Sequence, residues 1–123
     1  MNQEPDAYGG PLRRFTDPAY VPLAASLQEV RERIDALDCQ IVALLAERGR
    51  YVKDAARFKR DSFQVSAPAR QQEVFDKVRA LAEASGAYPE VVEAAYRALV
   101  AGFIAREQQD FAAMEDVPPE ESK

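Results

Sequence analysis

Apolar residues recur at three- and four-residue steps from Ser26 to about Arg60, which predicts one long amphipathic helix. Ser26 opens this stretch and Glu29 follows three residues later, a pairing in which each side chain caps the other's backbone N–H. At roughly 1.5 Å per residue the helix is about 50 Å long, whereas a domain of this size is only about 30 Å across. We therefore expect its apolar stripe to be buried against a second copy of the chain. The stripe consists of Leu27, Val30, Ile34, Leu37, Ile41, Leu44, Leu45, Val52 and Ala56.

Two further apolar patterns with the helical period follow the first one. Pro68 fits the first turn of a second helix, which runs to about Ser85 and has Gly86 as its natural C-terminal cap. Pro89 opens a third helix, whose apolar face continues to Phe111. Residues 61–67 are expected to form a connection. The predicted fold class is all-α, with a long, a shorter and a long helix.

Proline content and polarity divide the chain into three parts. Residues 1–25 contain four of the eight prolines and predict an irregular N-terminal arm. Residues 26–114 carry the three helical patterns and form the predicted domain. Residues 115–123 are polar, include two prolines, and are expected to be a flexible tail.

Composition narrows the classes of function. The net charge of −5 argues against nucleic acid or an anionic membrane as a partner, because both require a basic surface. The chain has no histidine, which excludes histidine-based metal sites and triads, and its single cysteine, Cys39, cannot form a disulfide within the chain. There is no glycine-rich phosphate loop, so we expect neither cofactor nor metal. No apolar run is long enough to span a membrane and no signal peptide is recognisable, so a cytoplasmic location is expected.

Two cations interrupt the stripe of the first helix where its period calls for an apolar residue. Arg48 and Lys59 are eleven residues apart, about three helical turns, so both are expected to point the same way. In an antiparallel pair of such helices, Arg31 of one chain could approach Arg48 and Lys59 of the other. Buried cations need anions, which favours a pocket for a small, doubly anionic ligand. The alternative is that these long side chains reach the edge of a helical bundle.

The second and third helices add one candidate each. Arg70 falls in the first turn of the second helix, where free backbone N–H groups already favour an anion. Glu107 lies on the apolar face of the third helix, four residues after Phe103. An ionised carboxylate is costly in such a place unless a cation pairs with it. The alternative for Glu107 is a position at the edge of the face, in contact with water.

Residues from about 27 to 111 resemble the all-helical chorismate mutase family, including its isochorismate pyruvate lyase branch. The resemblance is carried by VRERIDALDCQIVALLAERGRYVKDAARFK, by APARQQ, and by the third helix through FIAREQQ. It implies an intertwined homodimer in which the long first helices pair and the subunits share two active sites. It also implies the pericyclic rearrangement of chorismate, a small dicarboxylate, to prephenate without a cofactor.

The resemblance implies a role for each matching position. Arg31 enters the neighbouring subunit's site and binds one substrate carboxylate, and Arg48 binds the other. Lys59 contacts a carboxylate and the ether oxygen of the enolpyruvyl group. Arg70 lines the site.

Two positions depart from the commonest pattern of the family. Glu107 stands where many members have a glutamine that donates to the ether oxygen, so Glu107 must be protonated to act in the same way. Gln71 stands where mutases often carry a glutamate that binds the ring hydroxyl.

Three alternatives to a chorismate mutase stay open. The segment VSAPARQQ looks more like the isochorismate pyruvate lyase branch, which produces salicylate and pyruvate, whereas Gln71 and Glu107 favour a mutase. Rearrangement of 4-amino-4-deoxychorismate is a third activity of the same chemistry. A non-enzymatic helical dimerisation module, in which the three cations pair with surface acids, is an alternative of another class.

Overall fold

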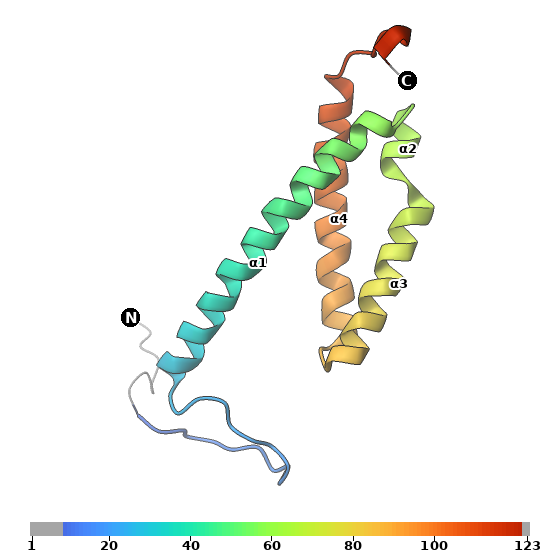
Figure 1. Ribbon diagram of the computed structural model, residues 1–123. Helices are drawn as coiled ribbons and strands as arrows, with labels where there is room; N and C mark the ends of the chain where they lie inside the picture. The colour runs from blue at the N-terminus through green and yellow to red at the C-terminus, as the bar shows by residue number, and fades with distance from the viewer. Residues whose placement is uncertain (1–8, 122–123) are drawn as a thin grey trace. The chain divides into compact units, whose positions relative to one another are not determined.

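The computed structural model describes residues 9–121 and contains helices but no strand in that range (Figure 1). The all-α fold class predicted from the sequence is confirmed. The chain divides into two compact units, one ending at Ala46 and one beginning at Glu47. None of the helices in the described range is long and apolar enough to cross a membrane.

The first unit contains most of helix α1, which runs over Leu27–Ala55 and continues into the second unit. The Ser26 hydroxyl accepts a hydrogen bond from the backbone N–H of Glu29 at 3.1 Å. The Glu29 carboxylate accepts one from the N–H of Ala25 at 3.0 Å, one residue before the expected partner. These bonds satisfy donors that a helix start leaves open, which explains why α1 begins here. No residue of α1 is buried, and five residues of its apolar stripe are exposed: Val30, Ile34, Leu37, Ile41 and Leu44.

The second unit is built around two antiparallel helices that lie side by side, α3 (Pro68–Ser85) and α4 (Pro89–Ala112) (Figure 1). Both begin with proline, as predicted. Gly86 ends α3 in the left-handed region, at φ 79°, where a side chain would be strained. The helices bury a small core of Phe75, Val78, Ala82 and Val100, completed by Ala56 and Val65.

Polar contacts fasten α3 to α4 at the rim of this core. The Glu93 carboxylate accepts hydrogen bonds from Arg97 and from Arg79, both at 2.9 Å. These bonds lower the pKa of the Glu93 carboxyl from its ordinary value, that from Arg97 most. Because the folded-state pKa is the lower one, the stabilisation is present above the unfolded-state pKa and is lost as the pH falls through the folded one. The Arg97 guanidinium also lies 4.3 Å from the centroid of the Phe75 ring.

Two boundaries differ from the sequence prediction. The expected continuous helix to Arg60 is wrong, because α1 ends at Ala55 and a 3₁₀ turn, η1, covers Ala56–Phe58. Lys59 then adopts an extended conformation, with φ −98° and ψ 145°. The expected connection over residues 61–67 instead contains a short helix, α2, over Ser62–Ser66. A second 3₁₀ turn, η2, follows α4 at Pro119–Glu121.

Candidate active site

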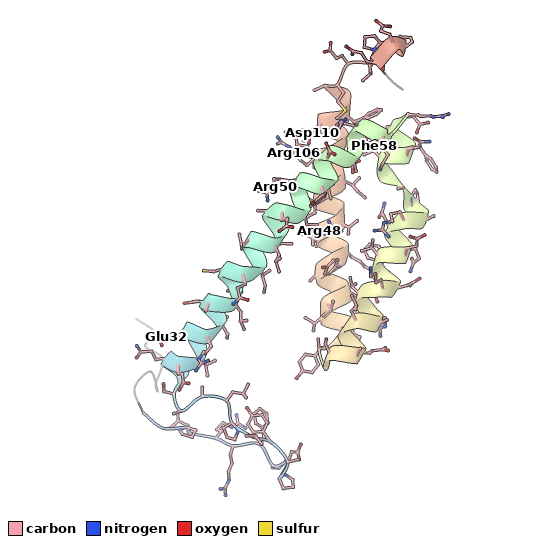
Figure 2. All side chains as sticks on the ribbon, in the orientation of Figure 1. Glu32, Arg48, Arg50, Phe58, Arg106 and Asp110 are labelled. Carbon is pink, nitrogen blue, oxygen red and sulfur yellow. The ribbon has the colours of Figure 1, made fainter. Side chains whose placement is uncertain are left out.

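Arg48 is presented by the C-terminal end of α1 and lies against α4 (Figure 2). Its guanidinium carbon is 5.3 Å from the centroid of the Phe103 ring and 5.8 Å from that of Tyr96. Cation–π contacts of this kind contribute about 0.5–2 kcal/mol each and hold the planar group in place. Within residues 9–121 no carboxylate forms an ion pair with Arg48. Its charge is therefore available to an anion that enters from outside.

Gly49 allows this close approach of α1 and α4. A Cβ atom at Gly49 would lie 3.0 Å from Cε1 of Phe103, which is tighter than nine in ten normal Cβ contacts. A glycine inside a helix costs about 1 kcal/mol relative to alanine, so its presence at this position requires a structural reason. The structure identifies the helix crossing as the reason.

Lys59 reaches the same region from the segment that follows η1. Its Nζ lies 3.4 Å from Oε2 of Glu107 and donates to the backbone carbonyl of Gln64 at 3.2 Å. Glu107 is only 4% exposed, the single charged residue among those buried in the described range. The cation that the sequence required for a buried Glu107 is therefore Lys59. The expected geometry is wrong in one respect, because Lys59 does not continue the helical register of Arg48.

Arg70 and Gln71 lie in the first turn of α3. Arg70 is 68% exposed and forms an ion pair with Glu73 at 3.2 Å, a surface contact of small energetic value. Gln71 donates from Nε2 to the carbonyl of Ser66 at 2.6 Å. That bond fixes which end of the Gln71 amide faces Ser66, and leaves its Oε1 as an acceptor.

One cavity of about 470 Å³, built entirely by the second unit, is lined by five of the six candidate residues. Its charged lining residues are three cations and one acid, so the local charge is opposite to that of the whole chain. Apolar side chains make up most of the remaining wall, which strengthens electrostatic interactions inside. The lining consists of Arg48, Tyr51, Val52, Ala55, Lys59, Val65, Ser66, Ala67, Arg70, Gln71, Val74, Val100, Phe103, Ile104 and Glu107. We call it the cationic cavity.

The sixth candidate, Arg31, belongs to the first unit and is exposed there. Two other lining residues, Tyr51 and Ser66, were not singled out from the sequence as part of a site. Tyr51 follows Arg48 by three residues, so the helical period could have indicated it. Ser66 falls in the connection expected over residues 61–67, where no periodic pattern indicates a site.

The arrangement can bind and orient a small anion. Guanidinium groups bind carboxylates through paired hydrogen bonds, and an ammonium group donates as a point charge. No group of three or more Cys, Asp or Glu side chains in residues 9–121 could hold a metal ion. The cationic cavity therefore combines positively charged side chains, a mostly apolar wall and one buried carboxyl group.

Comparison with known proteins identifies the family. The chorismate mutase type II family model matches residues 30–108, well over half of the chain. The chain belongs to that family. All six candidate residues lie within the matched range.

Two curated relatives carry different names. A chorismate mutase of Methanocaldococcus jannaschii is 36% identical over 56 residues, which cover 45% of this chain and 57% of that protein. An isochorismate pyruvate lyase of Pseudomonas aeruginosa is 33% identical over 81 residues, which cover 66% of this chain and 80% of that protein. Family membership therefore extends over the whole cationic cavity, while the two names represent both branches considered above.

Proposed function

We propose that the protein is a chorismate mutase, an isomerase that converts chorismate to prephenate. The observation that carries this proposal is the convergence of Arg48, Lys59 and Glu107 on one cavity in which cations outnumber acids. A volume of about 470 Å³ suits a small molecule, since such sites measure roughly 300–1,000 Å³. Membership of the chorismate mutase type II family supports the same function.

Arg48 is proposed to bind a substrate carboxylate. Its guanidinium is held by the Phe103 and Tyr96 rings, so little mobility is lost when it pairs with the anion. Fixing the carboxylates holds the flexible substrate in its reactive shape, which is an orientation effect. The rearrangement breaks the ether C–O bond as a C–C bond forms, so no atom is gained or lost and no nucleophile is needed.

Lys59 and Glu107 are proposed to stabilise the transition state. As the C–O bond stretches, negative charge develops on the ether oxygen, and Lys59 can donate to it. Glu107 can donate only when it is protonated. Donors that are already in position need no reorganisation during the reaction. Each of them lowers the activation free energy by roughly a few kcal/mol, as an oxyanion-hole donor does. Arg70 and Gln71 are proposed to bind the polar groups of the substrate nearer the mouth of the cavity.

The proposal includes an intertwined homodimer in which Arg31 completes the neighbouring subunit's site. It is supported by the apolar stripe of α1, along which Val30, Ile34, Leu37 and Ile41 are all exposed. Apolar surfaces of this extent mark interaction sites. A cytoplasmic location stays a prediction from the sequence.

A second candidate function is isochorismate pyruvate lyase, which yields salicylate and pyruvate from isochorismate. It is favoured by the relative of that name, since the alignment covers 80% of its length.

The test compares turnover of chorismate, isochorismate and 4-amino-4-deoxychorismate by the purified full-length chain under identical conditions. A higher kcat/KM on chorismate is the result expected. A higher value on isochorismate would replace the mutase proposal by the lyase. No turnover of any of the three would leave the non-enzymatic dimerisation module.

A matched pair of variants links the activity to the cationic cavity. Arg48→Ala should lower kcat/KM by about 100- to 1,000-fold, the effect typical of losing one strong donor in an active site. Arg50→Ala removes the same group from an exposed position two residues along α1 and should leave kcat/KM unchanged (Figure 2). Equal activity of the two variants would contradict the assignment of the site.

A further inference from the structure

Helix α2 is too short to be stable on its own. It contains five residues, and forming the first turns of a helix is unfavourable without outside support. Asp61 caps its start by accepting a hydrogen bond from the N–H of Gln64 at 2.8 Å. Val65 is 2% exposed and anchors one side of the helix in the core. The helix packs against α4, so its position depends on tertiary contacts (Figure 1).

Gln108 of α4 binds both ends of this helix. Its Nε2 donates to the carbonyl of Ser62 at 2.9 Å and to the hydroxyl oxygen of Ser66 at 3.2 Å. A primary amide carries two N–H groups, so one side chain can make both bonds at once. Ser62 and Ser66 are the first and last residues of α2.

The position of α2 affects that of the Lys59 side chain through hydrogen bonds made by Gln64. The carbonyl of Gln64 accepts from Nζ of Lys59 at 3.2 Å, and the Gln64 side chain accepts from the N–H of Arg60 at 2.6 Å. The ammonium group of Lys59 thus has two contacts, Gln64 and Glu107. Glu107 immediately precedes Gln108 on α4. Both contacts of Lys59 therefore depend on the same turn of α4: the contact with Glu107 depends on it directly, and the contact with Gln64 depends on it through α2.

We propose that Gln108 is a positioning residue, which holds α2 against α4 and thereby fixes the Lys59 ammonium group at the cationic cavity through the carbonyl of Gln64. This role rests on the proposed function, since Lys59 is the group that contacts substrate. Gln108 itself is not among the residues that line the cavity.

The experiment replaces Gln108 by Met, which has nearly the same shape and no N–H donor. Gln109→Met is the matched control, because Gln109 is the next residue of α4 and is exposed. Amide hydrogen exchange of the full-length protein is measured first. The N–H groups of Val65 and Ala67, bonded at 3.3 Å and 3.0 Å to carbonyls within the α2 segment, should exchange faster in Gln108→Met only.

Turnover and binding then test the connection to Lys59. Gln108→Met should lower kcat by about tenfold, since small displacements of a catalytic group have effects of this order or larger. Its affinity for a bicyclic dicarboxylate transition-state analogue, measured by calorimetry, should fall by a similar factor. In a Lys59→Ala background the same substitution should leave that affinity unchanged, because the group it positions is absent.

Three outcomes would overturn the positioning role. These are exchange rates equal to those of Gln109→Met, an unchanged kcat, or equal losses of analogue affinity with and without Lys59. If the wild-type protein turned over none of the three substrates, the proposed function would fail, and the exchange data would still decide whether Gln108 holds α2. If Gln108→Met is unfolded at the assay temperature, Gln108→Asn replaces it, because its shorter amide cannot reach both oxygens.

Discussion

At the scale of single residues, the ion pair of Lys59 with the buried Glu107 is the main polar contact in the wall of the cationic cavity. Glu107 is 4% exposed, and its ion pair with Lys59 measures 3.4 Å. Removing one partner of a buried pair leaves an uncompensated charge, which typically costs about 3–5 kcal/mol. A dicarboxylate substrate brings further negative charge to the same ammonium group. Only a protonated carboxyl group at this position can donate a hydrogen bond to the substrate.

One substitution tests the role of donor that we propose for the side chain at position 107. Glu107→Gln should keep its activity at neutral pH, since an amide of nearly the same shape always has N–H groups to donate. Steady-state rates of the variant and the wild-type protein at neutral pH test this expectation. A loss of activity in Glu107→Gln would contradict the role given to Glu107.

The sequence indicated the charged residues of the cationic cavity, but it did not indicate the residues that hold them in position. Arg48 and Lys59 stood out because they interrupt an apolar stripe, and Glu107 because it lies on an apolar face. The sequence did not reveal the partners of Gln64 and Gln108, because a glutamine on a helix or in a connection has no local feature that indicates a distant partner. Their hydrogen bonds depend on how α2 packs against α4.

At the scale of the helices, the crossing of α1 and α4 affects both the stability of the fold and the geometry of the cationic cavity. Gly49 costs about 1 kcal/mol of helix propensity relative to alanine. The structure shows what the glycine makes possible, since Phe103 packs against its backbone and also supports Arg48. A side chain at Gly49 would have to displace that ring, and the guanidinium would lose one of its two aromatic contacts.

Two glycine substitutions distinguish the effect of helix propensity on stability from the effect of side-chain packing. Gly102→Ala, on α4 with no atom within 4 Å of the added Cβ, should raise the free energy of unfolding by up to about 1 kcal/mol. Gly49→Leu should lower it by about 1–3 kcal/mol and raise KM, because the added atoms overlap Phe103. Denaturant unfolding and steady-state kinetics measure the two effects. A stabilised Gly49→Leu with normal KM would show that the crossing is unimportant.

Helix ends and the short helix are where prediction from the sequence failed. Residues 56–60 favour a helix by composition, yet the regular helix ends at Ala55 and Ala56 is buried in the core of the second unit. Helix α2 has too few residues for its apolar period to be detected. The three long helices were predictable because each has many turns of periodic pattern and, at α3 and α4, a proline at the start.

At the scale of the whole molecule, the apolar stripe of α1 supports the proposed homodimer. The chain is long enough for one ordinary domain, yet no residue of its longest helix is buried. Burial of apolar area is the main favourable term in association, and a two-fold dimer lets the same stripe serve both subunits. We propose that in this assembly Arg31 of one subunit acts with Arg48 of the other.

Heterodimers whose two subunits carry different substitutions test whether each site takes Arg31 from one subunit and Arg48 from the other. A heterodimer of Arg31→Ala with Arg48→Ala should keep one intact site of two and so about half the wild-type kcat, because the intact residues meet across the interface. The control combines the wild type with the double variant Arg31→Ala, Arg48→Ala. It should be inactive, because each of its sites lacks one arginine. Two affinity tags allow each heterodimer to be purified and assayed on the substrate preferred by the wild type. If each site took both arginines from one chain, the pattern would reverse: the control would keep half the activity and the first heterodimer would have none.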